Sequence, residues 1–421
     1  MSRAGHSLVS RPHGPRPELL ERVRSALAAT LAFSRERGYA GHNKHDGLNS
    51  PLLGRLLGWS RPTRLVAIQA VMRSPVDLRR LLGVPRTRNP KGIGLFAHAL
   101  LDLHAAGGAG SEGAFGEAED LLAWLLDHPA EGFRGLSWGY PYPWQDAGFF
   151  APRDFPNRVV TSWIGLAFTE AARATGRAAY LEALARIAQF LTGEPRVLCD
   201  SREEMCLTYV PDASVDWAVV DVPALAGAFL AEAGALLDHP GLVDVARRLV
   251  RWVARRQTAY GAWFYTDPPA ASHITHDNYH TAIVLDCLDR FSEATGEAEH
   301  DAAYRLGLEY YRDHLFTPAW APRWMNDRRF PHDIHGAASA VLCFARAARR
   351  DPAWWGPATA VLDWALETMY DPRGYFYYQR TRWRTRRLFL MRWANAWMAR
   401  AMAAVLRAAR ESEAGSTNGD R

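Results

Sequence analysis

The stretch "VDVPALAGAFLAEAGALL" at residues 220–237 decides the fold, because apolar residues occupy nearly every side of the helix that it predicts. A helix that is apolar around its circumference is typical of a position inside a large core. Its many Ala and Gly residues indicate that neighbouring helices crowd it from all sides. The stretch therefore predicts an inner helix surrounded by others.

Stretches of the same kind recur along the chain at a regular spacing. The six starts lie near Lys91, Val160, Val219, Tyr279, Ile334 and Arg392, at separations of 69, 59, 60, 55 and 58 residues. A more amphipathic, charged helix is expected before each of them, at residues 17–36, 115–127, 179–192, 241–257, 299–315 and 354–369. Six helix pairs with a period near 60 residues indicate a repeat architecture.

The pairs predict an all-α fold, an (α/α)6 toroid of six helix hairpins with long aromatic-rich loops on one face. Amphipathic outer helices and apolar inner helices suit a closed double ring, and an open superhelix of the same pairs is the alternative. We expect a single domain over residues 16–410, with disordered ends at 1–15 and 411–421. In a closed ring, the first turns of the six inner helices line one funnel.

Composition and motifs exclude several classes of protein. The 421 residues carry a formal charge of +5, but no nucleic-acid-binding signature is present. No nucleotide-binding or hydrolase-elbow motif occurs, so we expect no cofactor and no nucleic-acid partner. The chain has neither an apolar leader nor a stretch long enough to span a membrane, which favours a cytoplasmic location.

Metal binding is the weakest of the chemical hypotheses. The four cysteines have no zinc-like pairing. The segment "HITHDNYH" offers possible ligands at His273, His276, Asp277 and His280. It lacks the HExxH pattern, and no second cluster accompanies it. We therefore expect no metal.

The segment "THDNYHTAIVLDCLDRF" at residues 275–291 places Asp277, Tyr279 and His280 in the first turn of an apolar helix. A helix cap with solvated histidines is the simplest explanation. Other inner helices also begin with polar and aromatic residues: Thr161, Ser162 and Trp163; Asp216 and Trp217; His332, Asp333 and His335; Arg392 and Asn395. One shared site explains this recurrence better than separate caps. The helix N-termini would favour an ionised Asp277 and a neutral His280.

Aromatic residues set in Gly- and Pro-rich loops predict platforms for sugar rings. The candidates are Trp138, Tyr140, Trp144, Trp263, Tyr279 and Trp393. Arg323, Arg382 and Arg392 could hold a carboxylate, sulfate or phosphate by bidentate contacts. A solvated surface loop is the alternative for the Arg run at 382–387.

An insertion, "GYAGHNKHDGLNSPLL" at residues 38–53, interrupts the first helix pair. Its Gly, Asn, Ser and Pro residues predict a structured loop, which would bring His45 and Asp46 to the funnel. A plain charged loop is the alternative. Lys91 forms the polar start of the first inner helix and is also a candidate for substrate binding, as is Asn395 in the last repeat.

The reaction classes differ in the groups they need. Glycosidic-bond cleavage needs two carboxyl groups facing across the bond, for which we expect Asp277 and Asp146, with Asp46 in reserve. Epimerisation or elimination beside a carboxylate needs a base and a cation, for which His280, His335 and Arg392 are available. A non-catalytic glycan-binding scaffold is the third hypothesis. Hydrolysis is our first expectation.

Several sequence blocks together resemble an uncharacterised bacterial family. They are "GYAGHNKHDGLNSPLL", "NPKGIGLF", "WGYPYPWQ", "DNYHTAIVLDCL" and "YYQRTRWRTRRLFLMRWANAWM", and they span residues 38 to 400. Members of that family, which includes the VpsJ-like proteins, sit among exopolysaccharide and capsule biosynthesis genes. They are often labelled aminolevulinate dehydratases, although this chain shows neither the barrel nor the Schiff-base lysine of that class.

The resemblance implies a six-hairpin (α/α)6 fold, a role in polysaccharide biosynthesis or processing, a sugar or oligosaccharide substrate, and partners in polysaccharide assembly. It names no reaction. The wider superfamily includes unsaturated glucuronyl hydrolases, polysaccharide lyases and N-acylglucosamine 2-epimerases. His280 and His335 could form the facing pair of an epimerase, but the His-x-x-Glu pattern of those enzymes is absent around them.

Overall fold

The computed structural model describes residues 14–146, 148–212 and 214–419. Its helices are α1 (Pro17–Arg35), α2 (Pro51–Leu57), α3 (Arg61–Arg73), α4 (Pro90–Ala106), α5 (Ala114–Asp127), α6 (Arg158–Thr175), α7 (Ala178–Gly193), α8 (Asp221–Leu236), α9 (Pro240–Ala254), α10 (Asn278–Thr295), α11 (Asp301–His314), α12 (Ile334–Ala348), α13 (Trp355–Thr368) and α14 (Trp397–Gly419). Short helical turns precede or join them at Asp46–Asn49, Pro269–Ala271, Pro352–Trp354 and Met391–Ala396.

The strands are short and lie in the loops between helices. They are β1 (Ala40–Gly41), β2 (Thr87–Arg88), β3 (Trp144–Gln145), β4 (Phe150–Ala151), β5 (Val197–Asp200), β6 (Met205–Leu207), β7 (Ala218–Val219), β8 (Thr266–Asp267), β9 (His332–Asp333), β10 (Tyr370–Asp371), β11 (Tyr375–Phe376), β12 (Gln379–Arg380) and β13 (Thr385–Arg386). Antiparallel pairing joins β1 to β2, β3 to β4, β5 to β6, β7 to β8 and β10 to β11, and β12 lies between β9 and β13.

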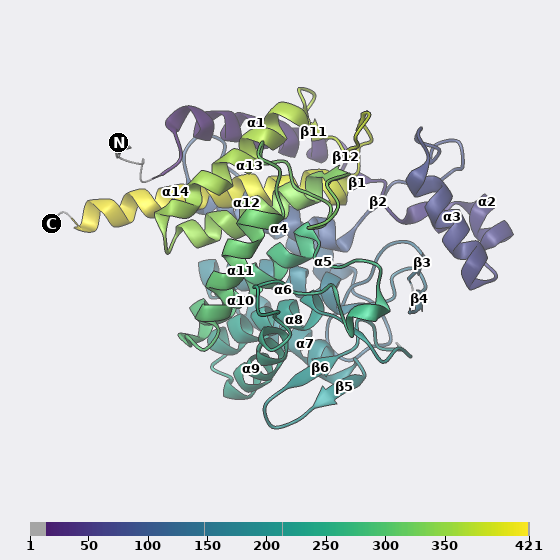
Figure 1. The fold of residues 1–421 in the computed structure, drawn as a ribbon, viewed down its shortest axis with the longest axis horizontal. Helices are drawn as coiled ribbons and strands as arrows, with labels where there is room; N and C mark the ends of the chain where they lie inside the picture. The colour runs from purple at the N-terminus through teal and green to yellow at the C-terminus, as the bar shows by residue number, and fades with distance from the viewer. Residues whose placement is uncertain (1–13, 147, 213, 420–421) are drawn as a thin grey trace, which may run out of the picture.

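The helices form a closed double ring (Figure 1). The inner ring runs α4, α6, α8, α10, α12, α14, each helix contacts the next, and α14 contacts α4 again. The outer helices α1, α5, α7, α9, α11 and α13 pack against it. The expected (α/α)6 toroid is confirmed, and the contact between the last and first inner helices excludes an open superhelix.

Small residues let the inner helices approach one another and the outer helices. A Cβ atom added to Gly165 of α6 would lie 2.5 Å from the ring of Phe229 in α8. One added to Gly227 of α8 would lie 2.7 Å from Cγ2 of Val250 in α9. Every residue of α8 from Asp221 to Gly234 is buried, as a helix enclosed on all sides requires. The small-residue pattern is therefore a packing requirement.

The insertion after α1 begins with the expected structured loop: residues 38–50 contain only β1 and the turn Asp46–Asn49, and α2 begins at Pro51. Ser50 caps α2 by accepting a hydrogen bond from the Leu53 amide, and Ser60 and Thr63 form a capping box at the start of α3. These caps satisfy backbone donors at the starts of two helices that follow the loop and that the sequence analysis did not predict. The two helices protrude from the ring (Figure 1) around a small separate core.

The C-terminal tail also differs from the expected disorder. Helix α14 continues as far as Gly419, and Glu411 forms ion pairs with Arg407 and Arg349. The pair with Arg407 lies within α14, and the pair with Arg349 joins α14 to the C-terminal end of α12. The expected disordered N-terminus lies, apart from residues 14 and 15, outside the described residues. Among the described helices, none is both long and apolar enough to cross a membrane.

Candidate functional site

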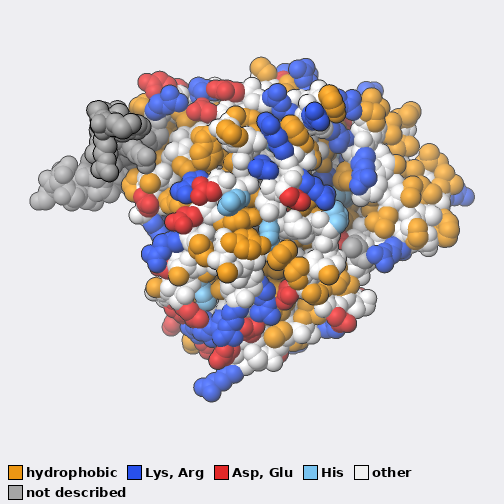
Figure 2. All heavy atoms as spheres, in the orientation of Figure 1, with side chains coloured by type: hydrophobic (Ala, Val, Ile, Leu, Met, Phe, Trp, Pro, Cys, Tyr) orange, Lys and Arg blue, Asp and Glu red, His pale blue; other side chains and the backbone are white. Residues whose placement is uncertain are grey.

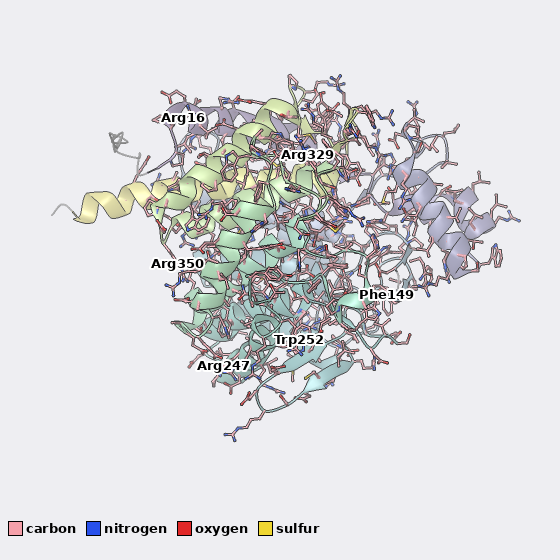
Figure 3. All side chains as sticks on the ribbon, in the orientation of Figure 1. Arg16, Phe149, Arg247, Trp252, Arg329 and Arg350 are labelled. Atoms are coloured by element: carbon pink, nitrogen blue, oxygen red, sulfur yellow. The ribbon has the colours of Figure 1, made fainter. Side chains whose placement is uncertain are left out.

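A cavity of about 550 Å³ opens at the end of the ring where the inner helices begin. Its wall combines first-turn residues of the inner helices with loop residues and one face of α3. In Figure 3, Phe149 at this cavity lies on the side of the molecule toward α2 and α3, whereas Arg350 lies on the opposite side. The funnel expected from the repeat is therefore present.

Most of the sequence-predicted site residues meet in this cavity. Those that line it are His45, Lys91, Tyr140, Trp144, Asp146, Tyr279, His280, His335, Arg392 and Trp393. Those that are not part of its described wall are Asp46, Trp138, Trp263, Asp277, Arg323, Arg382 and Asn395. The second set has identifiable roles elsewhere.

Asp277 lies behind His280 rather than in the cavity wall. Its side chain is 2% exposed, and its Oδ2 atom accepts a hydrogen bond of 2.7 Å from Nδ1 of His280. Burial lowers the pKa of His280, but the negative charges of Asp277 and Asp221 outweigh it and raise that pKa above its ordinary value. The pairing leaves Nε2 as the ring nitrogen that a ligand can reach. This shift favours the protonated form of His280, whereas a neutral ring was expected.

His335 has the opposite electrostatic character. Its ring stacks on Tyr279 with centroids 4.6 Å apart, and Tyr279 also contacts His280 at 4.1 Å. Neither ring nitrogen of His335 has a hydrogen-bond partner among the described residues. Burial and the positive charges of Lys91, Arg392 and Lys44 hold its pKa well below the ordinary value. The environment of His335 therefore favours its neutral form, whereas that of His280 favours the protonated form.

Asp221 is the cavity residue that the sequence analysis missed. It is the first residue of α8 and lines the cavity, and its Oδ1 atom has no hydrogen-bond partner in the described part of the chain. Burial raises the pKa of this carboxyl group. An acidic residue in the first turn, two positions before Pro223, is a helix-start signal that could have indicated it. The preceding valines hid it inside an apolar run.

Three buried cations face the cavity without a carboxylate partner. Lys44, Lys91 and Arg392 all line it, and none forms an ion pair among the described residues. Instead the Lys44 ammonium lies 3.9 Å from the ring centre of Trp393, and the Arg392 guanidinium lies 5.2 Å from that of Tyr140. Burial lowers the pKa of Lys44 to about 8 and that of Lys91 well below its ordinary value.

The residues outside the cavity wall have structural partners. Asp46 accepts from the Arg79 guanidinium at 2.7 Å and from the Asn43 amide at 2.7 Å, so it fixes the 42–49 loop instead of facing the funnel. The indole groups of Trp138 and Trp263 donate to main-chain carbonyls of Leu125 and Val253 within the core.

Three further predicted ligand-binding residues also lie apart. Asn395 accepts from the Phe376 amide at 3.0 Å and donates to the Gly374 carbonyl, which fixes the β11 loop. Arg382 is exposed on the β12–β13 hairpin, where its guanidinium lies over Trp383. The amide of Arg323 donates to the Leu315 carbonyl. The positions of these residues in the sequence indicate which loop or helix start carries them, but they do not indicate the direction in which each side chain points.

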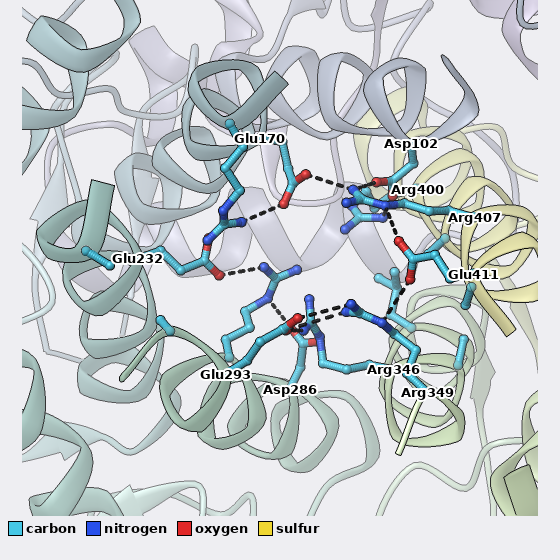
Figure 4. Close-up of a pocket in the computed structure, with 18 of the residues that line it drawn as sticks. Asp102, Glu170, Glu232, Asp286, Glu293, Arg346, Arg349, Arg400, Arg407 and Glu411 are labelled. Atoms are coloured by element: carbon cyan, nitrogen blue, oxygen red, sulfur yellow. Dashed lines mark hydrogen bonds and ion pairs between the residues drawn. The ribbon is translucent and has the colours of Figure 1, made fainter. Parts of the chain in front are cut away.

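A second cavity, of about 360 Å³, lies at the other end of the inner ring (Figure 4). Ten side chains form a closed circuit there, in which each pairs with the next: Arg407, Glu411, Arg349, Glu293, Arg346, Asp286, Arg290, Glu232, Arg173 and Glu170, which returns to Arg407. Asp102 of α4 joins it through Arg400 and Arg407. All six inner helices are thus linked.

The charged side chains of this circuit are already paired with one another, so they do not require a ligand to neutralise them. His98, Asp102 and Glu170 lie close enough to reach one metal ion. However, Arg400 contacts His98 and Asp102, and Arg407 contacts Asp102 and Glu170. Two guanidinium groups already occupy these ligand atoms and would repel a cation. Unpaired charge is concentrated instead in the cavity at the helix N-termini.

Comparisons with known proteins identify the architecture. No protein-family model matches the chain, and no curated protein is similar in sequence. An unsaturated glucuronyl hydrolase specific for heparin superposes with a TM-score of 0.60 at 12% identity, covering 95% of this chain and 98% of that one. The chain therefore shares the (α/α)6 toroid fold of this enzyme.

Two other solved structures with this fold carry different activities. A glycoside hydrolase family 76 mannosidase from Bacteroides thetaiotaomicron has a TM-score of 0.60 and 11% identity over 95% of this chain and all of its own. Cellobiose 2-epimerase from Bacillus thermoamylovorans has a TM-score of 0.60 and 9% identity over 77% of this chain and 90% of its own. At such identities the likeness establishes the fold, and the chemistry must come from the site.

Proposed function

We propose that this protein is an enzyme that transfers a proton at a carbon atom of an acidic saccharide, with His335 as base and His280 as acid. The observation that carries the proposal is a pair of histidines with opposite pKa shifts, set beside three unpaired cations in one cavity. When the surroundings shift the pKa values of two neighbouring groups in opposite directions, the group with the raised pKa can act as the acid and the one with the lowered pKa as the base.

The cations argue for an acidic substrate. Burying a charge without a partner costs several kcal/mol, so Lys44, Lys91 and Arg392 favour a ligand that supplies negative charge. The cavity wall carries five Lys and Arg side chains against two Asp, a net of +3. Arg392 suits a planar carboxylate, such as that of a uronic acid, because its guanidinium can make two parallel hydrogen bonds.

The proton transfer follows from these positions. Neutral His335 takes the proton from the carbon next to the carboxylate, and the C–H electron pair moves into the carboxylate as an enediolate. Lys91 and Arg392 stabilise the charge that develops on its oxygens. Protonated His280 then donates from Nε2 to the opposite face of the carbon, which inverts it, or to a leaving oxygen, which completes an elimination.

The aromatic wall supports a saccharide as the substrate. Tyr140, Trp144, Tyr279 and Trp393 line the cavity with flat apolar faces next to polar groups. Sugars present the matching combination of apolar ring faces and hydroxyl edges. The resemblance to VpsJ-like proteins and the printed activities of the structural relatives, a glucuronyl hydrolase and sugar epimerases, support a role in polysaccharide metabolism.

Hydrolysis of a glycosidic bond is the second candidate. Asp277 does not belong to the cavity wall, but Asp146 and Asp221 both do, and the raised pKa of Asp221 suits a general acid. In this hydrolase mechanism the two carboxyl groups are those of Asp146 and Asp221, and Asp221 takes the role that the sequence analysis gave to Asp277.

Nuclear magnetic resonance in deuterium oxide separates the two reactions. Uronate-containing oligosaccharides are incubated with the enzyme and their carbon-bound protons are followed. Proton transfer at carbon predicts deuterium at the position next to the carboxylate, or a new double bond. New reducing ends without either signal would support the hydrolase and overturn the proton-transfer proposal.

A further inference from the structure

The protruding insertion exposes an unusual amount of apolar surface. Its residues 51–86, which we call the lip, comprise α2, α3 and the following loop. Six of the eleven large hydrophobic side chains exposed in the described structure belong to it: Leu52 54%, Leu56 58%, Trp59 74%, Val66 59%, Val76 63% and Leu81 83%. Figure 2 shows hydrophobic side chains gathered over this end of the molecule. Such concentration marks an interaction surface.

The lip is also strongly basic. Its residues 51–86 contain seven Arg and one Asp, a net of +6, so the remaining residues of the +5 chain sum to −1. Arg55, Arg73, Arg80 and Arg86 are exposed. The formal net positive charge of the chain therefore comes from this segment, in which Arg79 is buried against Asp46 and the other arginines remain to act at the surface.

A basic groove adjoins the lip. It encloses about 430 Å³ and is lined by Arg37, Arg79, Arg80, Arg86, Arg386 and Arg387, with Asp77 as the one acidic residue of its wall. The Arg386 guanidinium donates to the carbonyls of Met72 and Ser74 at 2.8 Å, which joins the β12–β13 hairpin to the end of α3. The groove therefore has a fixed floor and several side chains that can receive anionic groups.

The lip is a preformed surface with two faces. Leu53 and Leu57 pack inward against Leu48, Ala67 and Ile68, while Leu52, Leu56 and Trp59 remain exposed. The cavity-facing side of α3 contributes Leu65, Gln69 and Met72 to the cavity described above. A partner bound to the outer face would therefore sit next to the cavity that we assign to the substrate.

We propose that the lip docks on the surface of an anionic lipid bilayer. Exposed Leu, Val and Trp next to arginines are the combination that binds membrane interfaces, where apolar side chains enter the headgroup region. The arginines add electrostatic attraction to an anionic membrane surface. A neutral protein surface would match the apolar residues but not the excess of charge. Docking would hold the cavity beside substrates attached to the membrane.

Sedimentation with lipid vesicles tests the proposal. The full-length protein is mixed with vesicles of phosphatidylcholine alone or with phosphatidylglycerol added, at low and high salt. We expect binding to the anionic vesicles, weaker binding at high salt, and little binding to neutral ones. The double variants Leu56→Ser/Trp59→Ser and Arg55→Glu/Arg80→Glu should each bind at least tenfold more weakly.

Matched variants keep the test specific. Tyr260→Ser/Leu306→Ser removes two exposed hydrophobic residues outside the lip, and Arg202→Glu/Arg305→Glu reverses two exposed arginines there. Both should bind vesicles like the wild type, and circular dichroism checks that all variants fold. Absent binding to anionic vesicles, or equal binding by lip and control variants, would overturn the proposal. A dimer that only Leu56→Ser/Trp59→Ser abolishes, without vesicle binding, would assign the lip to a second copy instead.

Discussion

Nδ1 of His280 lies 2.7 Å from Oδ2 of Asp277, and this pairing explains the polar first turn of α10. Asp277 occupies the N-cap position of α10, yet its side chain makes no capping hydrogen bond in the described structure. In the next repeat, Asp333 occupies the same position and does cap, accepting from the His335 amide at 3.0 Å. Equivalent aspartates thus leave one histidine paired and the other free, which gives the two rings different pKa values.

Removing the charge of Asp277 should change the pH profile. A raised pKa keeps His280 protonated to higher pH, so activity should fall as pH rises through that pKa, and also at low pH where His335 gains a proton. In Asp277→Asn the pKa of His280 should drop, and the alkaline limb should move to lower pH. On the alkaline side of the profile, the rate of Asp277→Asn should fall in proportion to the fraction of His280 that is still protonated, about tenfold for each pH unit. An unchanged alkaline limb in a folded variant would exclude Asp277 as the positioning residue.

Arg392 should bind the acidic group of the substrate, in addition to stabilising the enediolate. Losing a charged hydrogen bond costs about 1.5–3 kcal/mol, so Arg392→Gln should raise KM roughly ten- to hundredfold for an acidic saccharide. A neutral sugar alcohol or methyl ester of the same saccharide should bind Arg392→Gln and the wild type equally. Equal losses for both ligands would mean that Arg392 supports the cavity wall and does not recognise charge.

Lys44 predicts a pH dependence of binding. Its pKa, lowered to about 8 by burial, means that it loses its charge as pH rises past 8. Affinity for an acidic saccharide, measured by calorimetry in an inactive His335→Gln variant, should therefore decline above pH 8. Bound anion should raise this pKa in the complex, so the decline should continue until the pH reaches the pKa of Lys44 in the complex. Lys44→Arg should remove that step, because guanidinium stays charged. A decline that persists unchanged in Lys44→Arg would assign it to another group, such as Lys91.

The ion-pair circuit should stabilise the ring. Arg290 is buried between Asp286 and Glu232, with separations of 2.8 Å to each. Arg290→Met would leave two buried carboxylates short of a partner, and we expect a loss of about 3–5 kcal/mol in the free energy of unfolding. Arg312→Met, which breaks an exposed pair with Asp313, should cost at most about 1 kcal/mol. Urea unfolding measures both, and equal effects would refute the role of the circuit.

The same circuit predicts sensitivity to acid. Arg290 and Arg346 overcome the effect of burial and lower the pKa of Asp286 to about 2, and the pKa of Glu170 is lowered as well. A carboxyl group with a depressed folded-state pKa stabilises the protein above its unfolded value near about 4. That contribution is lost as pH falls from about 4 to about 2. Unfolding followed by circular dichroism should therefore begin in this interval, and at higher pH in Arg290→Met.

The sequence was sufficient for the ring but not for the direction of its side chains. A period near 60 residues and all-round apolar helices predict the toroid, because only enclosed helices can bury such faces. Tyr279, His280 and His335 were predicted correctly as funnel residues because first-turn position alone brings them there. Position in the sequence does not show whether the side chain of Asp277 faces the cavity or His280. The direction of this side chain depends on whether it caps the helix or pairs with His280.

Other differences have similar physical causes. Asp221 was missed because flanking Val and Pro residues made it part of an apolar run, although burial is what gives its carboxyl group a raised pKa. Asp46 was expected as an alternative catalytic carboxylate, but its side chain is paired with the guanidinium of Arg79, which lies 33 positions away in the chain. Partners that distant cannot be inferred from local patterns. The two helices of the lip were not predicted, because the sequence analysis assigned no element between the loop at residues 38–53 and Lys91.

Deuterium exchange at carbon tests the central claim most directly. A uronate-containing oligosaccharide is incubated in deuterium oxide with wild-type protein, His335→Gln or His280→Gln, and followed by nuclear magnetic resonance. The account predicts deuterium next to the carboxylate with the wild type and a rate at least a hundredfold lower with His335→Gln. The account would be contradicted by a product that carries neither deuterium at carbon nor a new double bond. It would also have to form in both folded variants as fast as in the wild type.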